Sequence, residues 1–223
     1  YALKYFSKFE SRNTQDFKKI RFASKKAHVS IIKSDGKQAQ LIFGFVTGIS
    51  YHHEDRFPMR VIVDILSTGV SSRLFHKLVY ELGIAYSAWA QAWSFTDTGL
   101  FYVGGGFAPQ NMQKAIEVIL EELDKLKRKK VNKIELKEAK EKDKAALNFS
   151  LETPDAIANL YSSQQITEKQ NMTPEEISQK IDEVTAEDLQ RVARKYFTRE
   201  NVCVTIKGPL NQNDAEKIER LFK

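Results

Sequence analysis

Residue types that build disulfide and metal sites are scarce in this sequence. It has one cysteine, Cys203, and four histidines among 223 residues. A single cysteine forms neither a disulfide framework nor a thiolate metal site. Cys203 lies in the strand-like run 202–206, where a buried cysteine usually acts as a small apolar residue.

Long apolar runs are also missing. No stretch of about 18 consecutive apolar residues occurs, which argues against a membrane-spanning helix. The chain does not open with the charged and then apolar pattern of a signal peptide. With 42% hydrophobic and 29% charged residues the composition is that of a globular protein. We expect a soluble protein with no membrane partner; the compartment is unknown, with the cytoplasm favoured.

The charge is not concentrated in one sign. The net charge is +6, and a basic balance can indicate a nucleic-acid partner. However, acids and lysines alternate through residues 133–144, which is typical of a solvated helix face with spaced ion pairs. The basic cluster 127–130 lies where a helix should end, and cations suit a helix C-terminus. We expect no nucleic-acid partner.

The strand signals are few and widely separated. Residues 1–16 are interpreted as a lead-in segment or linker, and residues 17–223 as a single domain. Strands are expected at 17–22, 28–33, 40–49 and 200–206. Asp35 and Gly36 favour a tight turn that would join the second and third strands as a hairpin. Because strands alternate irregularly with long helical stretches, we predict an α+β fold: a mainly antiparallel sheet with helices packed on one face.

Helical signals dominate the second half. Pro58 suits a helix start, and apolar residues then recur at helical spacing. Thr173 and Thr185 each open a capping pattern. Two further helices are expected at about 112–130 and 132–150. Another should begin at Thr153, with Ile157, Leu160 and Tyr161 facing inward, and a short last helix should begin at Asp214.

The stretch 69–107 links a helix to a β-hairpin. Ser71 or Ser72 is expected to cap the helix, and Gly83 to end it. Two strands follow, joined by a turn at 96–99. On the first strand, Trp89, Trp93 and Phe95 should share one face, and Tyr86, Ala88, Ala90 and Ala92 the other. Small residues on a face let a helix or a substrate chain lie close. The glycines 104–106 let the chain bend or let another backbone approach.

No self-contained catalytic group is evident. The cluster His52, His53, Glu54 and Asp55 lacks metal-ligand spacing and is interpreted as a polar loop. Tyr86 could donate a hydrogen bond at the mouth of a cleft, although a half-buried tyrosine is the simpler interpretation.

Three motifs, 69–75, 82–87 and 97–101, resemble the C-terminal-half signature of the insulinase/pitrilysin-type zinc metallopeptidases, which include mitochondrial processing peptidase. The segments 135–140, 184–188 and 204–209 are similar to that family in order and spacing. The resemblance extends over about residues 38–210.

The resemblance implies one of two homologous halves. The catalytic half of the family carries the zinc motif H-x-x-E-H, which is absent here. It therefore implies no catalytic residue and no metal ligand in this chain, with zinc held by a partner N-terminal half. The family's non-catalytic half often offers an arginine seven residues before a tyrosine to hold substrate. Tyr86 matches the tyrosine, but Val79 stands at the arginine position. Tyr86 and Arg73 are the candidate substrate-binding residues.

We therefore expect the C-terminal, non-zinc-binding domain of a zinc-dependent metallopeptidase, which helps to form a peptide-binding chamber. Its partners would be the N-terminal catalytic half or a homologous subunit, and a peptide substrate. By itself the chain should be inactive, and whether the parent protein is an enzyme is left open. The alternative is an inactive structural or assembly subunit derived from the same family.

Overall fold

The computed structural model describes residues 1–9, 18, 26–168 and 171–222. Within the lead-in segment, a short helix α1 (Ala2–Phe6) forms. The strand expected at 17–22 falls, apart from Lys18, outside the described residues. The body of the chain extends from residue 26 onward.

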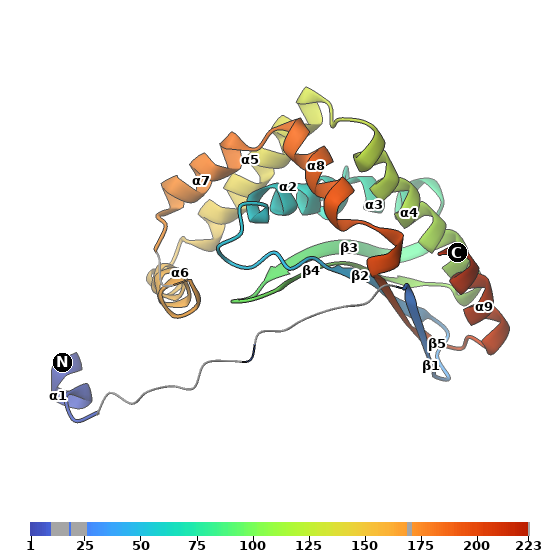
Figure 1. Ribbon diagram of the computed structural model, residues 1–223, viewed down its shortest axis with the longest axis horizontal. Helices are drawn as coiled ribbons and strands as arrows, with labels where there is room; N and C mark the ends of the chain where they lie inside the picture. The colour runs from blue at the N-terminus through green and yellow to red at the C-terminus, as the bar shows by residue number, and fades with distance from the viewer. Residues whose placement is uncertain (10–17, 19–25, 169–170, 223) are drawn as a thin grey trace.

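One five-stranded sheet forms the base of the body (Figure 1). Its spatial order is β1 (His28–Lys33), β5 (Val202–Gly208), β2 (Ala39–Val46), β4 (Gly99–Phe107) and β3 (Ala85–Ser94). Neighbouring strands are antiparallel except β1 and β5, which are parallel. The predicted α+β class with a mainly antiparallel sheet is confirmed.

The predicted hairpin between the strands at 28–33 and 40–49 is wrong. The C-terminal strand β5 inserts between β1 and β2, so Ile206 lies beside Ile31 on one side and Leu41 on the other. The backbone N–H of Ser34 bonds to the carbonyl of Gly208 at 3.1 Å. The segment around Asp35 therefore crosses the end of β5 instead of closing a tight turn.

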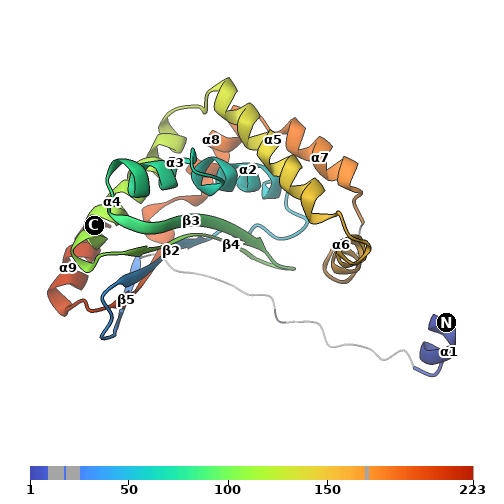
Figure 2. The same ribbon diagram turned by 180° about the vertical axis from the view of Figure 1, so that it is seen from behind.

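Helices cover one face of the sheet, as Figures 1 and 2 show from opposite sides. The helices on this side are α2 (Arg56–Ser67), α3 (Arg73–Phe75), α4 (Met112–Arg128), α5 (Lys133–Ser150), α7 (Pro174–Glu183), α8 (Ala186–Tyr196) and α9 (Gln212–Arg220). Helix α6 (Pro154–Thr167) does not cover the sheet. Short 3-10 turns occupy Pro109–Asn111 and Arg199–Asn201. Every second residue of β2, β4 and β5 points under these helices into the core, including Leu41, Phe43, Phe101, Val103, Val204 and Ile206.

Local sequence signals account for several helix starts. Thr173 and Thr185 both form complete capping boxes, with Glu176 and Asp188 as the reciprocal partners. The side chain of Asn132 accepts bonds from two backbone N–H groups at the start of α5. These caps satisfy donors that have no partner inside the helix.

The predicted helix after the serines differs from expectation. It consists of the single turn α3 followed by a π-helical segment, His76–Glu81. Ser72 occupies the N-cap position but makes no capping bond, and its buried hydroxyl has no hydrogen-bond partner among the described residues. Gly83 ends the segment with φ +60°, as predicted, because glycine adopts this region without a steric penalty.

Helix α6 is packed more loosely than the sequence predicts. Ile157, expected to face inward, is 42% exposed, whereas Leu160 and Tyr161 are half-buried. The helix lies beyond the end of β3 and β4 (Figures 1 and 2). Polar and apolar residues are distributed around all sides of α6, so the helix has no continuous apolar stripe to bury.

Candidate functional site

The alanines of β3 let a helix lie close to the sheet. Ala88 and Ala90 are buried beneath α2. The hydroxyl of Ser67, at the end of α2, donates to the carbonyl of Ala90 at 3.0 Å. The predicted small-residue face is thereby confirmed as a helix-packing face.

Aromatic side chains gather on the opposite, open face of the sheet. The ring of Tyr102 meets Trp89 and Trp93 edge to face, at centroid distances of 5.6 and 5.2 Å. Trp93 remains 52% exposed. Its other neighbour is Phe95, at 6.4 Å. These four residues form what we call the aromatic surface, and its rings are available for apolar contacts.

Glycines form the floor beside the aromatic surface. A Cβ atom on Gly104 would lie 2.2 Å from the ring of Trp89, so only glycine lets the indole lie over this strand. A Cβ atom on Gly105 would lie similarly close, 2.4 Å, to the carbonyl oxygen of Ser87. The prediction of close approach is confirmed, although these glycines lie inside β4 rather than bending it.

Tyr86 does not share the face of the alanines, and that prediction is wrong. The pairing of β3 with β4 is irregular between Ala85 and Ser87, which places an extra residue in β3. Such a bulge reverses the alternation of faces locally. Tyr86 is therefore 66% exposed, away from the buried alanines.

Arg73 is part of an ion-pair network between helices. Its Nε and Nη2 atoms donate to the two carboxylate oxygens of Glu135 at 2.6 and 2.8 Å. The carboxylate of Glu122 lies 4.0 Å from the guanidinium. Both substrate-binding candidates are thus placed: Tyr86 is exposed on β3, and the guanidinium of Arg73 joins α3 to α5. Val79, at the position of the expected arginine, packs half-buried against the core.

The outer edge of β3 carries backbone groups that do not pair with β4. Those of Ala88 and Ala90 are buried beneath α2, and only Ala92 and Ser94 are half-exposed. The turn bond from Phe95 N–H to the Thr98 carbonyl fixes the hydrogen-bond parity of the hairpin. Because parity alternates along an antiparallel pair, the N–H and C=O groups of Ala88, Ala90, Ala92 and Ser94 point away from β4. Among the described residues, only the Ala90 carbonyl has a partner there, namely Ser67.

Edge strands are usually protected by charge, proline or a cover. Residues 85–94 contain no charged residue and no proline. This edge was not predicted from the sequence, although the uncharged run was a signal that could have identified it.

A trough opens where β3 ends. It has a volume of about 820 Å³ and lies between β3, α2 and α6. Ala92 and Ser94 form part of one wall and Val63 of another. Residues of α6 at helical spacing complete it: Ala156, Asn159, Leu160, Ser163, Gln164 and Thr167. One face of α6 therefore looks into the trough instead of packing on the sheet.

Arg56 lines this trough and connects the helices around it. Its guanidinium binds the Tyr51 carbonyl, the Glu168 carboxylate at 2.6 Å and the sulfur of Met172 at 2.9 Å. The side-chain amide of Gln164 donates a hydrogen bond to the Met172 carbonyl and accepts one from the Met172 N–H. The C-terminal end of α6 is thereby tied to the start of α2.

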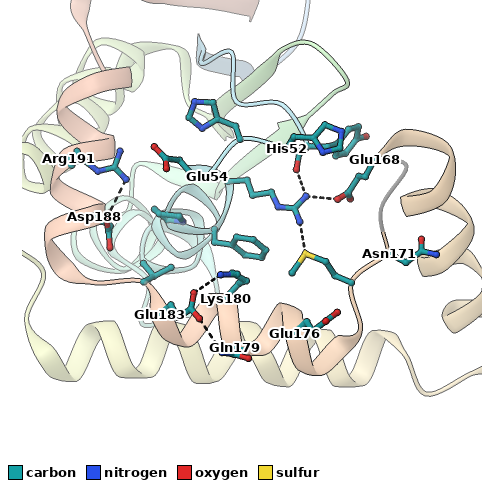
Figure 3. Close-up of a pocket in the computed structure, with 17 residues that line it drawn as sticks. His52, Glu54, Glu168, Asn171, Glu176, Gln179, Lys180, Glu183, Asp188 and Arg191 are labelled. Atoms are coloured by element: carbon teal, nitrogen blue, oxygen red, sulfur yellow. Dashed lines mark hydrogen bonds and ion pairs between the residues drawn. The ribbon is translucent and has the colours of Figure 1, made fainter.

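A second, charged pocket of about 900 Å³ lies on the far side of Arg56, and Figure 3 shows its lining. Most of its charged groups already have partners. Lys180 binds Glu183 at 2.8 Å, and Arg191 lies 3.5 Å from Asp188. The pocket is best described as a set of surface ion pairs.

Asp55 anchors the polar loop 52–55 to α8. Tyr196 donates to its carboxylate at 2.7 Å, Lys195 at 3.0 Å, and Arg191 lies 2.6 Å away. Burial would raise the pKa of Asp55, but these three hydrogen bonds and the charge of Arg191 bring the pKa below its usual value. The loop prediction holds for His52, which is exposed, whereas Asp55 is fully buried.

The histidines are dispersed. His28 is on β1, His52 and His53 precede α2, and His76 is in the π-helical segment. Within the part of the chain that the structure describes, no three potential ligands come together to hold a metal ion. The side chains described do not fit a zinc site.

These features define an α+β domain with helices on one side of the sheet and an open face on the other, and with no metal-binding cluster among the described residues. The chain belongs to the M16 peptidase family: the family model described as the peptidase M16 inactive domain matches residues 1–142. The recognition from the three motifs is confirmed, and the chain is a non-catalytic, C-terminal-type domain of this family.

Individual relatives agree with this assignment. The chain is 30% identical over 174 residues to an uncharacterised zinc protease, YmxG, of Bacillus subtilis, covering 78% of this chain and 42% of that protein. It is 28% identical to a mitochondrial-processing peptidase beta subunit of Lentinula edodes, covering 74% and 37%. The crystal structure of a Helicobacter pylori protease shares the fold, with a TM-score of 0.79 and 21% identity over 93% of this chain and 50% of that one.

The chain spans about two-fifths of the length of the curated relatives it matches. No helix among the described residues is long and apolar enough to cross a lipid bilayer.

Proposed function

We propose that this domain binds extended peptide within the chamber of a zinc-dependent M16 peptidase whose metal is held by an N-terminal half or a homologous subunit. The observation that carries this proposal is the half-exposed end of β3, where the N–H and C=O groups of Ala92 and Ser94 point away from β4. An extended peptide supplies complementary groups at the same two-residue repeat. Water is the only other general partner for such groups.

The aromatic surface and Tyr86 adjoin this edge. A strand added to β3 would direct alternate side chains toward the open face, where the Trp93 ring is exposed. The hydroxyl of Tyr86 has no hydrogen-bond partner among the described residues and is free to donate to a peptide carbonyl. Arg73 contributes indirectly, by holding the helices in place.

A proline substitution on the edge strand β3 tests the proposal. Ala92→Pro removes an outward N–H without removing a bond to β4, because the Ala92 N–H points away from that strand. We expect it to weaken the binding of an extended peptide at least tenfold, whereas the matched variant Ala92→Ser, which keeps the N–H, binds normally. Amide exchange at Ala92 and Ser94 should slow when peptide is added. Unchanged exchange in the presence of saturating peptide would refute strand addition.

A structural or assembly role is the second candidate. It is favoured by Val79, whose apolar side chain cannot supply the charge of the expected arginine. This role predicts that Tyr86→Phe leaves every activity of the full-length complex unchanged. A large loss of peptide turnover in that variant would eliminate it.

A further inference from the structure

The trough between β3, α2 and α6 is larger than strand addition alone requires. Main-chain pairing along an edge needs only open backbone groups and space for the added strand. Here the edge also opens into about 820 Å³ of space beside Ala92 and Ser94.

The walls of the trough are largely apolar. Ile49, Phe57, Met59, Val63, Ala92, Leu151, Leu160 and Ile177 all line it. The charged residues that line the trough are Arg56, Arg60 and Glu168. Each has an ionic partner: Arg56 pairs with Glu168, and Arg60 pairs with Asp143 at 2.5 Å. The trough therefore presents apolar surface and no unpaired charge.

We propose that this trough is a specificity pocket for a bulky apolar side chain of the peptide that pairs with β3. The inference rests on the proposed peptide binding and adds a substrate preference to it. The occupant is an extended peptide because Ala92 and Ser94, whose N–H and C=O groups point away from β4, are half-exposed beside the trough. An extended backbone can pair with these groups while it places a side chain between α2 and α6.

The geometry of an added strand explains the preference. Its side chains alternate between the two faces of the sheet. Those on the helical side enter the trough, and those on the other side reach the aromatic surface. Leucine, isoleucine, methionine or phenylalanine at one position on the helical side would remove the apolar walls from water.

Two peptides that differ at one position test the pocket. Both are uncharged, about seven residues long and composed of alternating threonine and glutamine, with leucine or alanine at the centre. NMR titration of the 223-residue chain gives a dissociation constant for each and shows whether the Ala92 and Ser94 amides shift. We expect the leucine peptide to bind about tenfold more tightly, since three additional carbon atoms leave water.

A pair of neighbouring variants on α6 locates the preference. Ser163 lines the trough and is exposed, so Ser163→Trp fills the space without disturbing the core. Ser162 is equally exposed but does not line the trough, which makes Ser162→Trp the matched control. The leucine preference should fall below twofold in Ser163→Trp and stay near tenfold in Ser162→Trp.

The outcomes separate the two proposals. If neither peptide binds, strand addition itself is wrong. If both bind equally, or if Ser163→Trp retains the preference, peptide binding stands and the specificity pocket is wrong. If sedimentation shows a dimer of the chain that Ser163→Trp dissociates, the trough is occupied by a second copy, and the peptide assignment is overturned.

Discussion

The guanidinium of Arg73 binds both carboxylate oxygens of Glu135, and this fork-to-fork pair connects α3 with α5. Bidentate geometry is specific to arginine, because a lysine ammonium cannot match two oxygens in a plane. The two side chains are only 22% and 27% exposed, so solvent screens the pair less than a surface pair.

Arg73→Lys should therefore destabilise the domain. Lysine keeps the charge but cannot form both bonds to Glu135, whereas Glu122 keeps its pair with Lys125 at 2.8 Å. We expect a loss of about 1–3 kcal/mol in the free energy of unfolding. Urea denaturation measures this. A variant of normal stability that loses only peptide affinity would instead assign Arg73 to substrate.

Gly104 is expected to be intolerant of any side chain. In Gly104→Ala the new methyl group would occupy the position of the Trp89 ring, whose nearest atom is 2.2 Å from that point. The ring must move, and we expect a loss of about 1–3 kcal/mol, typical of overpacking. Thermal unfolding and the near-ultraviolet circular dichroism of the tryptophans report both effects.

Gly106 provides the matched control on the same strand. A methyl group added at this position would have the amide end of Gln40 as its nearest neighbour, at 3.2 Å, and that side chain can rotate away. Gly106→Ala should change stability by less than half the effect at Gly104. Equal effects at both positions would show that β4 itself, and not the Trp89 contact, requires glycine.

The two glycines illustrate what the sequence predicts. Three adjacent glycines in a strand indicate close approach, but not which ring approaches, because that depends on strand order. The helices α4 and α5 were predictable, since apolar spacing and caps are local. The insertion of β5 beside β1 was not, because residues as far apart in the sequence as His28 and Cys203, which pair here, leave no local pattern. The bulge that exposes Tyr86 could not be predicted from the sequence either.

Asp64 makes stability depend on pH. Burial raises its pKa from 3.8 to about 6, and the charge of Asp143 adds to this, against a hydrogen bond from Thr68. A raised carboxyl pKa means that the folded state binds the proton more tightly than the unfolded state. This contribution is fully present below pH 3.8 and is lost as pH rises through about 6.

Asp64→Asn removes this dependence and keeps an oxygen for the Thr68 hydroxyl. We expect the variant to be more stable than the parent by about 1–3 kcal/mol at about pH 8, with a smaller difference at about pH 5. Urea denaturation at the two values measures it. A difference that does not grow between these two pH values would show that Asp64 titrates normally.

Thr185 was predicted as a helix cap, and so was Ser72, as one of two alternatives with Ser71, but only Thr185 forms the bond. Thr185 Oγ1 accepts from the Asp188 N–H at 3.1 Å, whereas the Ser72 hydroxyl is buried without a partner among the described residues. Thr185→Ala should cost about 1 kcal/mol. Ser72→Ala removes a buried unsatisfied group, so we expect stability to be unchanged or to rise by about 1 kcal/mol. Chemical denaturation of both variants compares them directly, and a clear loss in Ser72→Ala would mean that its hydroxyl has a partner in solution.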